Sequence, residues 1–380
     1  MKIEQCQWSA EKGWQPSLSA GTLGADAQVV FLFGSADLLK RFGCLDAVRR
    51  AYPKAYLFGC STAGEIQSGG VSDETVALTA IHFEHTRLVV ARTRIDGPEG
   101  SLAAGEQLAR KFDPDGLRHI FVLSEGLKAN ASELVNGINS VVAPGVSISG
   151  GCAGDGNRLQ TTHVWCDGEP EESTVVGLGF YGDRLRVGVS AIGGWKPFGP
   201  DRLITRSKQN VLYEIDNRPA LALYKQYLGR FAEGLPASGL MFPLELRVGE
   251  QGYPVLRALL GVDEKAQSIT FAGNVPEGVH ARFMVGQIED LIEGTRVAAR
   301  ESLQGLGAFQ PQFSILVSCN GRRFVLKQRI EEEVDAVREA LGPGAVLTGF
   351  YSYGEIAPAK TGGHCELHNE TMTITSFSEV

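Results

Sequence analysis

Three loops of this chain each frame an acidic residue with glycines. The first loop runs over Gly59–Glu65, the second over Gly151–Asp155 and the third over Gly349–Glu355. Glycine allows the backbone to approach a ligand closely, and a carboxylate can accept hydrogen bonds from a ligand amine. The recurrence predicts a duplicated unit that presents backbone and acid to a small molecule. Tight turns whose acids cap local backbone are the alternative.

Other side chains in and near these loops add to the candidate site. Cys60 and Cys152 are predicted to occupy matching positions, where thiols could act as soft ligands. An arginine could clamp the carboxylate of Glu355 or of a ligand, and aromatic rings supply contact area. A buried thiol, a salt bridge and core packing are the structural alternatives. The candidate ligand-binding residues are Gly59, Cys60, Ser61, Gly64, Glu65, Gly151, Cys152, Asp155, Arg322, Tyr351, Tyr353 and Glu355.

The sequence places no general base beside a nucleophile in these loops. Ser61 lies in a segment that narrowly misses the Gly-x-Ser-x-Gly elbow of hydrolases, and no histidine is placed as its base. A hydrolase or thiol enzyme that uses Ser61 or Cys60 is therefore a rival class, and we expect that the protein is not an enzyme. Gly177–Gly182 has dinucleotide-binding spacing, but it lacks the following helix N-terminus that would hold a pyrophosphate.

Metal-binding patterns are weak. The chain has no Cys-x-x-Cys and no His-Glu-x-x-His. His82 and His85 would point to opposite faces of a strand, so they cannot share an ion. His364, Glu366 and His368 would share one face of an extended segment. Non-covalent haem on a single histidine is an open alternative.

Composition narrows the class of protein. The 380 residues carry a net charge of −8, which argues against a sequence-independent nucleic-acid surface. No apolar run is long enough to span a bilayer, and the N-terminus lacks the apolar core of a signal peptide. We therefore expect a cytoplasmic protein without a membrane segment. The seven scattered cysteines are typical of reduced thiols rather than a disulfide framework.

The order of apolar runs predicts an α/β fold. Two strands around one helix form a parallel, right-handed unit, and an aspartate-glycine turn between two apolar runs predicts a hairpin over 174–192. The predicted strand, helix and strand of successive units are 29–33, 37–48 and 55–58, then 119–124, 130–142 and 146–149, and finally 313–317, 331–341 and 345–347.

These elements predict two α/β domains with mixed sheets, built from duplicated βαβ-plus-hairpin units. Residues 1–28 are polar and contain glycine and proline, so an irregular lead-in is expected. The first domain is predicted at 29–228 and the second at 229–380.

The chain resembles the FIST sensory-domain family along nearly its whole length, with an N-terminal FIST-like part at 29–228 and a C-terminal FIST-like part from 229. Ordered motifs in both halves carry the resemblance. They are Phe58–Glu65, Gly150–Asp155 and Asn210–Ala220 in the first half, and Ser318–Arg322, Gly349–Pro358 and Leu367–Thr371 in the second.

The resemblance implies a sensor of a small-molecule ligand. Stand-alone members that look like this chain include NosP-type haem proteins, which sense nitric oxide and act on a partner histidine kinase or cyclic-di-GMP enzyme. This implies haem b as cofactor, with His163, His280 and His368 as unranked axial candidates. A sensor of amino acids or other polar metabolites is the alternative ligand class. A scaffold without a ligand is a third interpretation.

Overall fold

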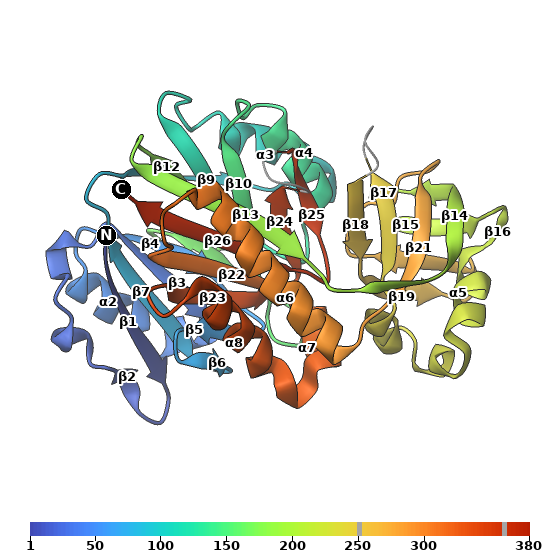
Figure 1. Ribbon diagram of the computed structural model, residues 1–380, viewed down its shortest axis with the longest axis horizontal. Coiled ribbons are helices and arrows are strands. Elements are labelled where there is room, and N and C mark those ends of the chain that lie inside the picture. The colour runs from blue at the N-terminus through green and yellow to red at the C-terminus, as the bar shows by residue number, and fades with distance from the viewer. Residues whose placement is uncertain (249–252, 359–362) are drawn as a thin grey trace.

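The computed structural model describes residues 1–248, 253–358 and 363–380. Its larger part, at the left of Figure 1, contains three sheets with helices packed on their outer faces. Both chain termini lie in this part. A smaller, β-rich part lies at the right of the same view.

Each of the three sheets is built on the same unit. Two parallel strands are joined by a helical crossover, and a later strand runs antiparallel beside the first. The first unit contains β1 (Lys2–Ser9), β3 (Val29–Gly34), α1 (Ala36–Arg41), α2 (Cys44–Ala51), β4 (Tyr56–Cys60) and β7 (Val76–His82). The second contains β8 (Arg87–Arg94), α3 (Ser101–Ala109), β9 (Leu117–Ser124), α4 (Ala131–Asn139), β10 (Ser147–Cys152) and β12 (Thr174–Tyr181). The third contains β13 (Leu185–Ile192), α6 (Ile288–Ser302), β22 (Phe313–Cys319), α7 (Asn320–Leu326), α8 (Ile330–Leu341), β23 (Val346–Ser352) and β26 (Met372–Glu379).

Strand β3 is apolar throughout because both faces of its sheet are covered. In β3, Phe31 and Phe33 face the centre of the molecule, whereas Val30 and Leu32 face the helices. This alternation follows from the two-residue period of a strand. A continuous apolar run is therefore what such a strand requires.

The three sheets meet in one central hydrophobic core. The ring of Phe31 lies 6.1 Å from that of Phe121 and 5.8 Å from that of Phe313, centroid to centroid. These rings come from β3, β9 and β22, which are equivalent strands of the three units. The units therefore share a core instead of forming separate ones.

Short strands exchanged between units close this arrangement. After β4, the chain forms β5 (Glu65–Gln67), which pairs with β23 of the third unit. After β10 it forms β11 (Val164–Cys166), which pairs with β4 of the first unit. After β23 it forms β24 (Gly354–Pro358), which pairs with β10 of the second unit. Each unit therefore completes the sheet of another. The shorter edge strands are β2 (Gly13–Gln15), β6 (Gly70–Ser72) and β25 (Cys365–His368).

The β-rich part is an insertion in the third unit, between β13 and α6. It has its own apolar core around Tyr224, Phe271 and Phe283. Its elements are β14 (Lys196–Lys208), β15 (Val211–Ile215), β16 (Arg218–Pro219), α5 (Ala220–Leu228), β17 (Leu244–Val248), β18 (Tyr253–Arg257), β19 (Leu259–Asp263), β20 (Ser268–Phe271) and β21 (His280–Val285).

One glycine in each unit fixes how closely the two parallel strands approach. Gly59, Gly150 and Gly349 stand opposite Leu32, Val122 and Leu316 in the three strand pairs. At each of the three positions an added Cβ would lie 1.8 Å from the carbonyl oxygen of the facing residue. Only glycine fits this register.

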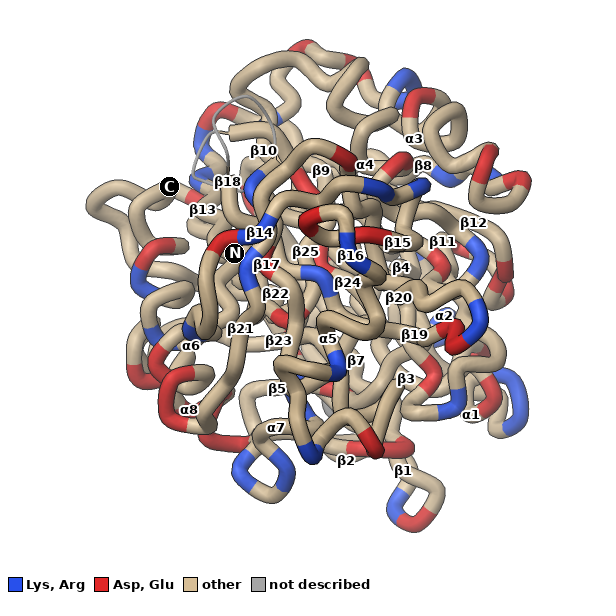
Figure 2. Tube along the Cα trace, turned by 90° about the vertical axis from the view of Figure 1, so that its right-hand side faces the viewer, with Lys and Arg blue, Asp and Glu red and all other residues tan. Residues whose placement is uncertain are grey.

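Charged residues are interspersed along the molecule, as Figure 2 shows for the view onto the insertion. None of the helices in the described residues is both long and apolar enough to cross a membrane.

The predicted α/β class, with mixed sheets, is confirmed. Three details of the prediction are wrong. The segment before residue 28 is not an irregular lead-in throughout, because β1 pairs with β7 along seven residue pairs. The helix predicted at 37–48 is two helices, since Gly43 adopts φ 62° between α1 and α2.

The hairpin predicted over 174–192 is also wrong. β12 pairs with β8 and β9, whereas β13 pairs with β26 in another sheet. Gly182 therefore links two repeated units, and β8, which matches β13, begins the second unit. The predicted boundary at 229 falls just after α5, inside the insertion.

We expect Gly59→Ala to destabilise the fold by about 1–3 kcal/mol, because its methyl group would force β3 and β4 apart. Urea denaturation of the purified variant measures this cost. Gly344→Ala is the matched control, since an added Cβ there meets no atom within 4 Å. Equal unfolding midpoints for the two variants would contradict the close-approach argument.

Candidate functional site

The three repeated loops meet one another through backbone hydrogen bonds. The Ala63 amide donates to the Tyr351 carbonyl at 2.8 Å, and the Tyr351 amide donates to the Gly64 carbonyl at 2.8 Å. The Gly154 amide donates to the Ser61 carbonyl at 2.9 Å. The loops that are far apart in sequence therefore form one junction.

The strand register changes how the loops correspond. Gly59 matches Gly150, so Cys60 matches Gly151 and not Cys152. The sequence pattern predicted that the two cysteines occupy equivalent positions. The register shows that this prediction is wrong. By the same register, Asp155 is one place earlier than the equivalent of Glu65.

Glu65 and Glu355 occupy the same setting in the first and third units. Each side chain accepts hydrogen bonds from a hydroxyl three residues earlier, Thr62 at 2.6 Å or Ser352 at 2.6 Å. The other carboxylate oxygen accepts from the amide and hydroxyl of a threonine, Thr75 in the first unit and its equivalent in the third. Both acids therefore fasten their loop to the strand that follows.

Burial changes the titration of these two acids. Desolvation raises the pKa of Glu65 to about 7 and that of Glu355 to about 8, although the hydroxyl and amide donors oppose it. Glu355 is fully buried, whereas Glu65 is 2% exposed and lies at a cavity wall.

A cavity of about 680 Å³ opens beside the junction. Its walls are formed by Thr62–Glu65, Asp73–Glu74, Asp155–Arg158, the start of α1 and the exposed face of α7. This volume lies within the range of about 300–1,000 Å³ that is typical of small-molecule sites. Because all three units contribute, the cavity is a product of the assembled fold.

Oppositely charged groups line the cavity. Arg323 of α7 forms a bidentate ion pair with Asp73, with both N–O distances 2.8 Å, and also donates to the Ala63 carbonyl. Its guanidinium lies 4.9 Å from the centre of the Tyr351 ring. Arg158, Lys327 and Asp37 also line the cavity. Among the described residues, none of these last three forms an ion pair.

Asp155 holds the second loop in place. Its carboxylate accepts hydrogen bonds from the backbone amides of Leu159, Gln160 and Thr161 and from the hydroxyl of Tyr353. Burial alone would raise the pKa of Asp155, but these donors outweigh it and hold the pKa below its ordinary value. The acid is therefore a negative, well-anchored part of the cavity wall.

A smaller cavity of about 190 Å³ adjoins the first one and contains Ser61 and His163. The backbone amide of His163 donates to the Ser61 hydroxyl at 2.9 Å. The Nδ1 atom of His163 is buried and has no hydrogen-bond partner among the described residues. Burial lowers the pKa of this imidazole, so it is neutral near pH 7.

The three histidines implied as haem ligands lie in different places. His280 is exposed on β21, and His368 is 4% exposed with its Nε2 at 3.2 Å from the Ala357 carbonyl. His163 lines the smaller cavity. That cavity is small and lined by hydroxyl, amide and charged side chains, whereas a haem ring needs apolar walls. The lining of this cavity therefore suits a polar ligand better than a haem ring.

Within the described ranges, no group of three or more histidine, cysteine, aspartate or glutamate side chains could hold a metal ion.

Several predicted site residues lie away from the cavity. Cys60 and Cys152 are buried, and burial raises the pKa of both thiols. Tyr351 is fully buried below Arg323. Gly64, Glu65 and Asp155 line the main cavity and Ser61 lines the smaller one. The remaining predicted residues, which line neither cavity, are Gly59, Gly151, Arg322, Tyr353 and Glu355.

Arg322 and Arg323 show what the sequence interpretation missed. Both arginines lie on a helix, because α7 begins at Asn320, directly after β22. Neighbouring side chains on a helix point about 100° apart, since a turn contains 3.6 residues. Arg322 is therefore fully buried and paired with Glu333, and Arg323 faces the cavity.

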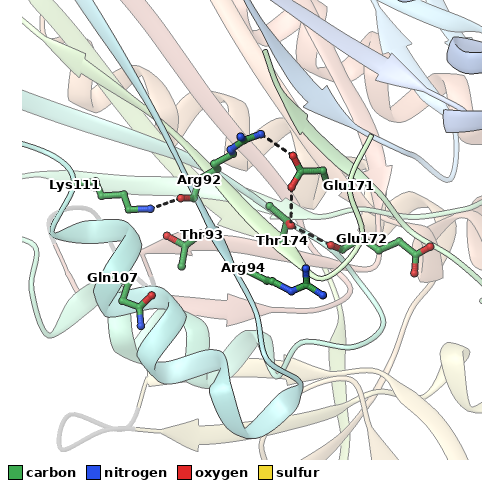
Figure 3. Close-up of a pocket in the computed structure, with 8 residues that line it drawn as sticks. All are labelled: Arg92, Thr93, Arg94, Gln107, Lys111, Glu171, Glu172 and Thr174. Atoms are coloured by element: carbon green, nitrogen blue, oxygen red, sulfur yellow. Dashed lines mark hydrogen bonds and ion pairs between the residues drawn. The ribbon is translucent and has the colours of Figure 1, made fainter. Parts of the chain in front are cut away.

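A second hollow, of about 520 Å³, lies beside the edge strand β8 (Figure 3). Within its lining, Arg92 pairs with Glu171 at 2.7 Å, and Lys111 donates to the Arg92 carbonyl. None of the three repeated loops contributes to it. We therefore do not assign it as the functional site.

Two domain families match this chain over most of its length. The FIST N domain matches residues 28–218, and the FIST C domain matches residues 220–358. The chain belongs to the FIST family. FIST domains are sensory domains that respond to small ligands in signalling proteins. The two matches meet inside the insertion, between β16 and α5.

Relatives with similar sequences are found in mycobacteria. This FIST chain is 26% identical over 367 residues to an uncharacterized protein of Mycobacterium tuberculosis, covering 93% of this chain and 92% of that protein. It is 30% identical over 251 residues to an uncharacterized protein of Mycobacterium bovis, covering 62% and 61% of the two chains.

Solved structures give weaker likenesses. A cyanuric acid hydrolase from A. caulinodans has a TM-score of 0.36 and 9% identity, with 100% of this chain and 98% of that one covered. A chorismatase has a TM-score of 0.37 and 10% identity, with 99% and 98% covered. At these TM-scores neither likeness carries an argument about fold or activity.

The raised pKa values of Glu65 and Glu355 predict a pH-dependent stability. The folded state binds these protons more tightly than the unfolded chain, whose glutamates titrate near 4.5. The contribution to stability is therefore complete below about pH 4.5 and is lost as the pH rises through about 7 to 8. The slope per group is at most about 1.4 kcal/mol per pH unit.

Thermal unfolding between about pH 5 and about pH 8.5 measures this slope. We expect Glu355→Gln, which mimics the protonated acid, to lose less stability than the unchanged protein as the pH rises. Glu11→Gln, at an exposed turn, is the control and should keep the original slope. A slope in Glu355→Gln as steep as in the control would contradict the assignment.

Proposed function

We propose that this FIST protein is a non-enzymatic sensor that binds an amino acid or a similar small polar metabolite in the 680 Å³ cavity. The observation that carries the proposal is the position of this cavity at the junction of all three repeated loops, with both signs of charge on its walls. Such a setting suits a ligand that carries both an amine and a carboxylate.

Different charged side chains on the cavity wall would bind the two charged groups of the ligand. Arg158 and Lys327 form no ion pair with described residues. The Nε of Arg158 donates to the Asp155 carbonyl at 2.9 Å, and a ligand carboxylate can bind the rest of its guanidinium or the Lys327 amine. Asp37, also without an ion pair among the described residues, is available to a ligand amine. The Arg323–Asp73 pair lines the same cavity and can rearrange around the ligand.

Haem with nitric oxide is the second candidate ligand, and one observation favours it. His163 offers a neutral imidazole with an unpartnered Nδ1 at the smaller cavity. The polar lining disfavours the ring itself, so we rank the polar metabolite first. Under either ligand, a partner histidine kinase or cyclic-di-GMP enzyme would receive the signal through a protein surface.

Catalysis by Ser61 has less support than binding. Ser61 is 3% exposed, and its hydroxyl accepts a hydrogen bond from a backbone amide rather than from an imidazole. Cys60 is fully buried with a raised pKa, which disfavours the reactive thiolate.

Isothermal titration calorimetry with each of the twenty amino acids tests the binding site. We expect saturable binding of at least one, weakened about 10- to 100-fold in Arg158→Gln, because a charge-assisted hydrogen bond is lost. Arg110→Gln is the matched control, since Arg110 pairs with Glu106 outside the cavity. Equal affinities in both variants would overturn this placement.

Haem titration of the purified protein separates the two ligand classes. We expect weak, non-saturating absorbance that is unchanged in His163→Ala. A saturable one-to-one spectrum, shifted by nitric oxide and lost in His163→Ala, would replace the metabolite by haem.

A further inference from the structure

We propose that α7 couples the cavity to the inserted β-rich part through two neighbouring arginines. Arg323 senses the state of the cavity, and Arg322 transmits movement of α7 to the base of the insertion. The inference rests on the proposed ligand site and adds how its occupancy would reach another part of the molecule.

The cavity end of the coupling is Arg323. Its guanidinium is held by both carboxylate oxygens of Asp73 and by the Ala63 carbonyl. A charged ligand that enters the cavity competes for these partners, because Asp73 is 61% exposed at the side chain and lies on the wall. In the proposed coupling, Arg323 and the short helix α7 are the part of this wall that shifts when a ligand takes these partners.

The other end is the connection between the insertion and the main body. The chain enters the insertion through Gly193 and Gly194 and returns to the body through Gly286. Gly194 adopts φ 77°, and its Cα lies 2.6 Å from where a Cβ of Gly294 in α6 would be. Glycine lets the two backbone segments cross at close range here. We call Gly193, Gly194 and Gly286 the hinge of the insertion, because short links of small residues between two parts of a chain are where φ/ψ changes are absorbed.

Arg322 binds both sides of this hinge. It donates to the Gly193 carbonyl at 2.6 Å and to the Leu291 carbonyl of α6 at 3.1 Å. Its guanidinium pairs with Glu333 of α8 at 2.9 and 3.0 Å. The side chain is fully buried, so any loss of these partners would leave an uncompensated charge inside the protein.

Tyr351 provides a second connection between Arg322 and Arg323, in addition to the backbone of α7. Its ring lies beneath the Arg323 guanidinium, and its hydroxyl donates to Glu333 at 2.7 Å. One carboxylate oxygen of Glu333 therefore accepts hydrogen bonds from Arg322, and the other accepts a hydrogen bond from Tyr351. The pair of arginines, the tyrosine and the glutamate form one packed network.

The insertion also contacts α7 and the hinge directly. α7 packs against the 3-10 helix Ala237–Met241 of the insertion. Trp195, the first residue beyond the hinge glycines, donates from its indole to the Glu370 carbonyl at 2.7 Å, and Arg322 approaches the same carbonyl. Arg322 joins α7 to the hinge through several hydrogen bonds. Moving α7 and the hinge as one unit therefore costs less free energy than breaking these bonds.

Hydrogen exchange by mass spectrometry on the full chain, without any ligand, tests this coupling. Asp73→Asn removes the charge that holds Arg323 and stands in for a ligand that displaces it. We expect exchange in peptides covering 191–198 and 286–296 to rise at least threefold. Asp183→Asn, which breaks the exposed pair with Arg118, is the control and should leave these peptides unchanged.

Tyr351→Phe supplies the second arm, because it removes only the hydroxyl link to Glu333. In that background, Asp73→Asn should change exchange at the hinge by a smaller factor than in the unchanged chain. Exchange altered only near residue 73 and in 320–326, with the hinge peptides equal to the control, would overturn the coupling. Such a result would leave amino-acid binding to be decided by calorimetry, since no ligand is present here. Conversely, unchanged affinity in Arg158→Gln would reject the ligand site while the coupling could hold.

Discussion

β5, β11 and β24 each leave the unit that precedes them and complete the sheet of another unit. This exchange of strands forces the loops before β5 and β24 and the loop after β10 into one place. The glycines opposite Leu32, Val122 and Leu316 keep the parallel strands close enough for that convergence. The cavity, its charges and the short helix α7 all depend on this junction.

Local patterns in the sequence predicted the strands within each repeated unit. The apolar run before Gly59 required a strand buried on both faces, and β4 is such a strand. The turn at Gly182 was misinterpreted as a hairpin because a turn signal does not reveal which sheets its strands join. The register of the second loop was wrong by one residue, since Gly150 and Gly151 look alike in sequence but only Gly150 faces Val122.

The candidate site was predictable only in part. Asp155 and Glu65 were expected at a ligand site and line the cavity, whereas Glu355 is enclosed by its own hydrogen bonds. Asp73 and Arg323 lie 250 residues apart, so no local pattern could pair them. Arg322 was a candidate because it is an arginine. The geometry of the helix points its neighbour Arg323 into the cavity instead.

The central claim is that a small polar molecule binds where the three loops meet. Hydrogen exchange of the unchanged protein, with and without an equimolar mixture of the twenty amino acids, tests it most directly. The account predicts protection in peptides covering 35–38, 62–74, 155–161 and 320–327. Protection confined to other segments, such as β8 and α3 beside the second hollow, or no protection along the chain, would contradict it.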